Sequence, residues 1–172
     1  MASFAWSYLY TLAAVSVTFV GFSSLVIVLR QTMGGDMSKL DMLITRTFIQ
    51  VGFLVAAGAM LPALLSLFHL GEPTVWRISS AVTALAVVLF AGTYPVRRKT
   101  ASGVRTPLLI WIDVLVILGS GLLLGCNALS VVVSTGPGPY SAALTAILFV
   151  SGWAYLQAVN TMIKHHRAHS GQ

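Results

Sequence analysis

Five apolar runs, each about as long as a membrane-spanning helix, constrain this chain more than any other feature. They cover residues 4–29, 42–69, 76–95, 107–133 and 140–163. A helix needs about 20 apolar residues to cross a bilayer core about 30 Å thick. Glycine and proline separate the runs, as at Gly34-Gly35, and Pro95 closes the third run. We therefore predict an all-α fold, an integral membrane bundle of five transmembrane helices.

The composition agrees with lipid as the main solvent of the chain. Hydrophobic residues make up 57% of the sequence and charged residues only 8%, whereas a soluble domain carries about 25% charged residues. No Lys or Arg precedes Arg30, so the first run lacks the basic start of a secretory signal and is predicted to be a retained helix. We predict one transmembrane domain, residues 1–163, and a short basic cytoplasmic tail, residues 164–172.

The basic residues predict the direction in which the chain is threaded. With the N-terminus outside and the C-terminus inside, nine of the ten Lys and Arg residues lie inside and only Arg77 lies outside. This asymmetry is the positive-inside pattern. Because the basic residues alternate with apolar runs and do not form one patch, we expect no nucleic acid partner. We expect a multi-pass protein of a cell membrane, with the bacterial inner (plasma) membrane as the interpretation.

Asp113, in the stretch PLLIWIDVLVILG, is the acid that most needs an explanation. The helical rise places it about 9 Å along the fourth helix, near the inner interface. Arg46 and Gln50 of the second run, and Gln157 and Asn160 of the fifth, are expected at a similar level. Because an Arg fork can hold a carboxylate with two hydrogen bonds, we predict an Asp113–Arg46 ion pair within a polar layer. In the alternative, each charge reaches the headgroups separately.

Asp113 also begins a polar stripe, because Ser120 and Asn127 follow at intervals of seven residues. Seven residues is close to two helical turns, so the three side chains share one face. Two interpretations stay open for this face. It lines a path for water or solute, or its side chains make hydrogen bonds between helices, which are worth about 0.6–2 kcal/mol each.

Small residues and one proline complete the predicted structural features. Gly121 and Gly125 form a GxxxG pattern in the fourth run, and Gly52 lies within the second. Such glycines let helix backbones approach closely, so all three are predicted at helix-packing contacts. Pro62, inside the second run, leaves a carbonyl without its helical partner and should bend the helix. We predict a hinge there.

Two classes of function remain open from the sequence. One is an oligomeric transporter or channel that carries a small solute or ion along the Asp113–Ser120–Asn127 face. The other is a non-catalytic membrane-embedded accessory subunit or sensor that binds partner helices. The chain has no Gly-rich phosphate loop, HExxH motif or cysteine pair, and we expect no enzyme activity, no catalytic residue, no cofactor and no metal site. The expected partners are the lipid bilayer and either further copies of the chain or another membrane protein.

Overall fold

The structure is a computed structural model, and the residues that it describes form five long helices. It describes the backbone of residues 2–32, 39–102, 108–131 and 134–170, and the side chains of residues 4–29, 32, 42–100, 110–131 and 134–157. The helices are α1 (Ala2–Thr32), α2 (Lys39–Ser66), α3 (Glu72–Ser102), α4 (Leu108–Leu129) and α5 (Pro137–Ser170). Each is long and apolar enough to span a membrane. The predicted all-α fold, with five helices that are each long and apolar enough to span a membrane, is therefore confirmed.

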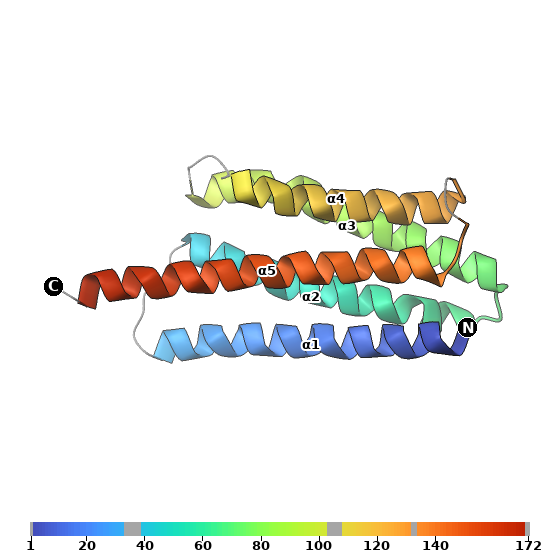
Figure 1. Cartoon of the computed structure of the whole chain (residues 1–172), viewed down its shortest axis with the longest axis horizontal. Helices are drawn as coiled ribbons and strands as arrows, with labels where there is room; N and C mark the ends of the chain where they lie inside the picture. The colour runs from blue at the N-terminus through green and yellow to red at the C-terminus, as the bar shows by residue number, and fades with distance from the viewer. Residues whose placement is uncertain (1, 33–38, 103–107, 132–133, 171–172) are drawn as a thin grey trace.

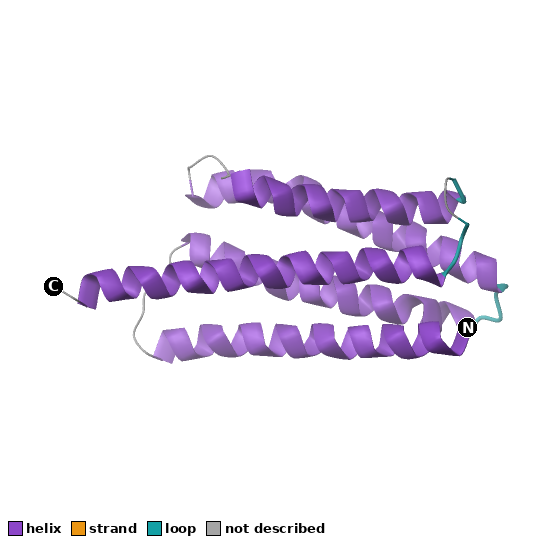
Figure 2. Ribbon diagram, viewed as in Figure 1, coloured by secondary structure: helices purple, strands orange, loops and turns teal. Residues whose placement is uncertain are grey.

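The helices lie roughly side by side along the long axis of the molecule, with the two termini at opposite ends (Figure 1). Every regular element among the described residues is a helix (Figure 2). In the described part of the chain, α2 packs on α1, α3 and α5, and α4 packs on α3 and α5, but α2 and α4 do not pack directly on each other. Space between α2 and α4 is therefore bounded by α3 and α5.

The two ends of the bundle differ in charge. Arg46, Arg97, Arg98 and Lys99 lie where α2 begins and α3 ends, and we call this the basic end. Arg77 lies near the start of α3, at the opposite end. The described side chains thus repeat the asymmetry seen in the sequence.

The interior of the bundle is filled by apolar side chains from every helix. Its largest members include Leu9 of α1, Val55 of α2, Trp76 of α3, Leu124 of α4 and Leu144 of α5, each at most 2% exposed. Many large apolar residues point outward instead, among them Phe4, Phe22, Phe53, Leu122 and Phe149. A surface of this kind is stable against lipid tails but not against water, as expected for a membrane bundle.

A hydrogen-bond network in the half of the bundle away from the basic end replaces a bond that Pro62 cannot make. Pro62 has no N–H, so the carbonyl of Gly58, four residues earlier, lacks its helical donor. Tyr140 of α5 donates its hydroxyl proton to this carbonyl at 2.6 Å. Since that proton is used, Thr83 of α3 is the donor in its 3.0 Å bond to the Tyr140 oxygen. Pro62 is therefore held by three helices, and the structure gives no support to the predicted hinge.

The end of the third helix differs from the prediction. We expected Pro95 to end it, but α3 continues through Pro95 to Ser102. A proline inside a membrane helix is tolerated when nearby groups supply the missing hydrogen bonds. Here Thr93 Oγ1 donates to the carbonyl of Leu89 at 2.8 Å, and Arg97 reaches back to Thr93 Oγ1 at 2.8 Å. Neither bond reaches the carbonyl of Ala91, four residues before Pro95, which is the group that the proline leaves without its helical donor.

The other helix boundaries shift by a few residues. The fourth helix ends at Leu129 rather than at residue 133, because Ser130 adopts a left-handed conformation with φ of 56°. The N–H of Val131 then bonds the carbonyl of Cys126 at 3.1 Å, which is a Schellman-type ending. The second helix ends at Ser66, and the fifth begins at Pro137, where proline suits a first helical turn.

We expect Tyr140→Phe to lower the free energy of unfolding by about 1–3 kcal/mol, because it leaves the buried Gly58 carbonyl without a donor. In a Pro62→Ala background residue 62 again has an N–H, so the same substitution should cost at least about 1 kcal/mol less. SDS titration of the purified protein in mixed micelles measures all four variants.

Tyr8→Phe is the matched control for this cycle. It removes an exposed bond to Thr145 Oγ1 and should change stability by less than about 0.5 kcal/mol. If Tyr140→Phe is equally destabilising with Pro62 and with alanine at that position, the Tyr140–Gly58 bond does not compensate for the proline.

Candidate functional site

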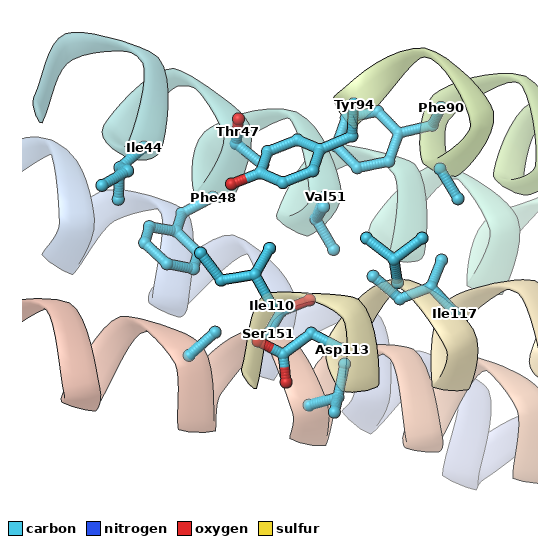
Figure 3. Close-up of a pocket in the computed structure, with 14 residues that line it drawn as sticks. Ile44, Thr47, Phe48, Val51, Phe90, Tyr94, Ile110, Asp113, Ile117 and Ser151 are labelled. Atoms are coloured by element: carbon cyan, nitrogen blue, oxygen red, sulfur yellow. The ribbon is translucent and has the colours of Figure 1, made fainter. Parts of the chain in front are cut away.

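A cavity of about 60 Å³ lies among α2, α3, α4 and α5 in the half of the bundle nearer the basic end. Each of the four helices contributes side chains, and Figure 3 shows them gathered around the space. The lining residues are Ile44, Thr47, Phe48, Val51, Phe90, Ala91, Tyr94, Ile110, Asp113, Val114, Ile117, Val150, Ser151 and Ala154. Four of them are polar and ten are apolar, so the few polar groups decide what the cavity can bind.

Asp113 is the charged member of this lining. It lies in the first turns of α4, and its side chain is partly buried. Ile110 and Ile117 lie beside it on the same face of α4, because they are three and four residues away, and both line the cavity, as does the adjacent Val114. Among the described residues, no hydrogen bond or ion pair to Asp113 occurs. The carboxylate thus faces a mostly apolar space inside a membrane span.

Two hydroxyl groups of the lining are committed to their own helices. Thr47 Oγ1 donates to the carbonyl of Leu43 at 2.8 Å, and Ser151 Oγ donates to the carbonyl of Ile147 at 2.7 Å. Each hydroxyl has one proton and two acceptor lone pairs. With the protons used, these side chains can only accept further hydrogen bonds.

Two arginines of α3 lie near the cavity at the basic end. The guanidinium of Arg97 donates to Gln50 Oε1 at 3.2 Å, and its Cζ lies 5.2 Å from the centre of the Phe90 ring. Arg98 is 8% exposed and donates to the Tyr94 hydroxyl at 3.5 Å. Both therefore reach back from the helix end toward the bundle interior, as helical side chains tend to do.

The structure does not bring Arg46 and Asp113 together. Arg46 is exposed on α2, and no ion pair between the two occurs in the described part of the chain. The physical reason is that α2 and α4 do not contact each other directly, while Arg46 points away from the cavity that Asp113 lines. Gln50 does join a polar contact, but its partner is Arg97.

The two predicted members of the polar layer on α5 have separate outcomes. Gln157 is partly buried at the basic end of α5 and is not part of the cavity lining. The side chain of Asn160 lies outside the described residues.

The predicted polar stripe is divided by the packing. Ser120 is buried and donates to the Val116 carbonyl of its own helix at 2.9 Å. Asn127 is fully buried, and its Nδ2 donates to Ser80 Oγ of α3 at 2.8 Å. Its Oδ1 accepts from the N–H of Gly136 at 3.1 Å, which ties α4 to the start of α5. Asp113 alone of the three lines the cavity, so the stripe is no continuous path within one chain.

Of the three glycines predicted at helix-packing contacts, two lie at such contacts and one does not. A Cβ at Gly52 would collide with Val20 of α1, and one at Gly121 would lie 3.1 Å from Val88 Cγ2 of α3. These two glycines allow the close α1–α2 and α3–α4 approaches. A Cβ at Gly125 would meet nothing within 4 Å, so Gly125 makes no such contact with the described residues. The GxxxG spacing alone could not show which of its glycines faces α3.

Several cavity residues were not singled out from the sequence. Thr47, Tyr94 and Ser151 line the cavity, and Arg97 contacts the ring of the lining residue Phe90. They belong to three different helices, so their side chains come together only after the helices pack. For Arg97 the sequence does contain one indication. Thr93 precedes it by four residues and so lies on the same helical face, which is the spacing at which the two side chains can form their hydrogen bond. Within the described residues, no group of three His, Cys, Asp or Glu side chains could hold a metal ion.

Comparison with known proteins adds no relative: no family model, no curated protein and no solved structure matches the chain.

The different surroundings of Asn127 and Asp113 predict opposite effects on stability. Asn127→Ala removes bonds to two other segments and should lower the free energy of unfolding by about 1–3 kcal/mol. Asp113→Asn removes a charge from a mostly apolar site and should be neutral or stabilising. SDS titration of both variants measures the contrast. A loss with Asp113→Asn as large as that with Asn127→Ala would show that Asp113 holds the fold together.

Proposed function

We propose that this five-helix membrane protein binds a small solute in the Asp113 cavity and carries it across the membrane, as a transporter or channel and not as an enzyme. The observation that supports this proposal is the Asp113 carboxylate, which lines an intramembrane cavity and makes no contact with an opposite charge among the described residues. Charged groups inside membrane spans are costly and mark substrate or ion pathways. A carboxylate that served only the fold would be expected to have a structural partner.

The proposed route differs from the polar stripe. Hydrogen bonds of Asn127 and Tyr140 close the half of the bundle toward the opposite end. A solute that entered at the basic end could leave by the opposite end only if α3 and α4 shifted against α2 and α5. Rocking of one group of helices against another is the usual way in which transporters alternate access.

The proposal includes an orientation for this route. We propose that the N-terminus lies outside and the C-terminus inside a plasma membrane, so that the cavity lies in the cytoplasmic half. Arg46, Arg97, Arg98 and Lys99 support this, because basic residues are retained on the cytoplasmic side.

An accessory subunit or sensor is the second candidate. A groove on the outer surface of α1 and α2 is lined by Ala13, Ala14, Ala56 and Ala57, with Tyr10, Val17, Phe53 and Met60 around them. Small side chains allow membrane helices to approach closely. In this second proposal the groove would hold one helix of a partner membrane protein or of another copy.

Charge displacement on a solid-supported membrane tests the transport proposal. Proteoliposomes would be exposed in turn to Na⁺, K⁺, ammonium, methylammonium, chloride and formate at constant ionic strength. We expect at least one solute to give a transient current that falls at least about tenfold in Asp113→Asn, because the proposed site loses its charge.

Arg46→Gln is the matched control, because it removes an exposed charge at the same end and should leave the current within about twofold. If no solute in the series gives an Asp113-dependent current, the transport proposal is overturned. Mass measurement in mild detergent would then show whether a partner or a second copy accompanies the chain, as the accessory proposal requires.

A further inference from the structure

We propose that the solute held at Asp113 is a small ammonium-type cation with free N–H groups, either ammonium itself or methylammonium. This inference rests on the proposed function and adds the chemical class of the solute. It follows from the charge, the hydrogen-bonding capacity, the aromatic walls and the size of the cavity.

The charge of the lining is negative. Asp113 is the one formally charged side chain among the 14 residues that line the cavity. In a low-dielectric space the attraction between opposite charges is several times stronger than in water. A cation is therefore favoured over a neutral solute, and an anion is disfavoured.

Three of the four polar side chains of the lining, those of Thr47, Ser151 and an ionised Asp113, can only accept hydrogen bonds from a ligand. The fourth, the Tyr94 hydroxyl, accepts a bond from Arg98 and keeps its own proton to donate. The Thr47 and Ser151 protons are given to the carbonyls of Leu43 and Ile147, so both hydroxyls offer only lone pairs to a ligand. An ionised carboxylate is likewise an acceptor only. A ligand with several N–H donors can satisfy these oxygens, whereas a ligand that only accepts leaves them without partners. An ammonium group has donors and no acceptor.

Aromatic rings supply further contacts that suit a cation. Phe48 of α2 and Phe90 and Tyr94 of α3 belong to the lining, and Figure 3 shows them on the side formed by these two helices. The face of an aromatic ring attracts cations within about 6 Å of its centre. Phe90 already binds one in this way, since the Arg97 guanidinium lies 5.2 Å from its centre.

The size of the cavity selects a small cation. Its volume of about 60 Å³ is less than half of the roughly 150 Å³ of an engineered cavity that binds benzene. Two or three non-hydrogen atoms fit such a space. Metal ions such as Ca²⁺ and Mg²⁺ require about six oxygen ligands, more than Asp113, Thr47, Tyr94 and Ser151 supply from four separate helices. Ammonium and methylammonium need fewer oxygens because part of their shell can be aromatic.

Positive charge near the cavity sets a limit on affinity. Arg98 contacts the hydroxyl of the lining residue Tyr94, and Arg97 contacts the ring of Phe90. Both guanidinium groups would repel a cation bound in the cavity, although Arg97 and Arg98 lie outside the lining itself. We therefore expect binding that is weak enough to allow rapid release, with a Kd on the order of 1 mM, which also suits a transported solute.

Thermal unfolding of the purified protein in detergent tests the inference. Methylammonium chloride at about 50 mM should raise the Tm of the wild-type protein by about 2 °C or more relative to NaCl at the same ionic strength, because a ligand that binds the folded state stabilises it. Tetramethylammonium has the same charge but no N–H group and a larger volume, and it should give no shift. Asp113→Asn should lose the shift given by methylammonium, and Arg46→Gln should keep it.

Ala154→Val provides a second test that leaves the carboxylate in place. It adds two carbon atoms to the cavity wall and should weaken methylammonium binding at least about fivefold. The inference is overturned if methylammonium gives no shift, if tetramethylammonium gives an equal shift, or if the shift survives in Asp113→Asn. An Asp113-dependent current with chloride or formate alone would also overturn it, while leaving the transport proposal standing.

Discussion

The bond from the Tyr140 hydroxyl to the Gly58 carbonyl joins α5 to α2 at the point where Pro62 interrupts the helix. A carbonyl without a donor is costly inside a bilayer, since no water is present to replace the bond. Thr83 extends the network to α3. The same point is closely packed, because a Cβ at Gly58 would lie 3.2 Å from Leu144 and 3.3 Å from Thr83. Three helices are thus aligned by one proline and the groups that compensate for it.

Many polar groups in the spans have hydrogen-bond partners, whereas Asp113, like Trp76 Nε1 and Ser79 Oγ, has none among the described residues. Asn127 bonds to α3 and to the start of α5, while Ser16, Ser23, Ser120 and Ser151 bond back to their own helices. These side chains stabilise the bundle. Asp113 makes no hydrogen bond or ion pair in the described part of the chain and instead lines the cavity among α2, α3, α4 and α5. In the function that we propose, this carboxylate binds a ligand from outside the chain.

The sequence predicted the number and approximate limits of the helices because bilayer thickness imposes a length that apolar runs must meet. It did not predict that α3 continues through Pro95, since the bonds of Thr93 and Arg97 near that proline depend on side-chain conformation. It predicted Asp113 as a residue of interest but paired it with Arg46. The depth of a residue along its helix can be estimated from the sequence, but the sequence does not show which helices are neighbours. In the structure α4 lies against α3 and α5, and not against α2, which carries Arg46. Tyr140 was missed because its partner is a backbone carbonyl 82 residues away.

The central claim is that the Asp113 carboxylate receives its partner from outside the chain. Difference infrared spectroscopy tests this directly, because the whole chain has only four acidic residues and so few carboxylate bands. Perfusion of the membrane-reconstituted protein with methylammonium, against NaCl of equal ionic strength, should shift a carboxylate band, and this shift should vanish in Asp113→Asn. A spectrum that does not change on perfusion, or a shift that persists in Asp113→Asn, would contradict the account.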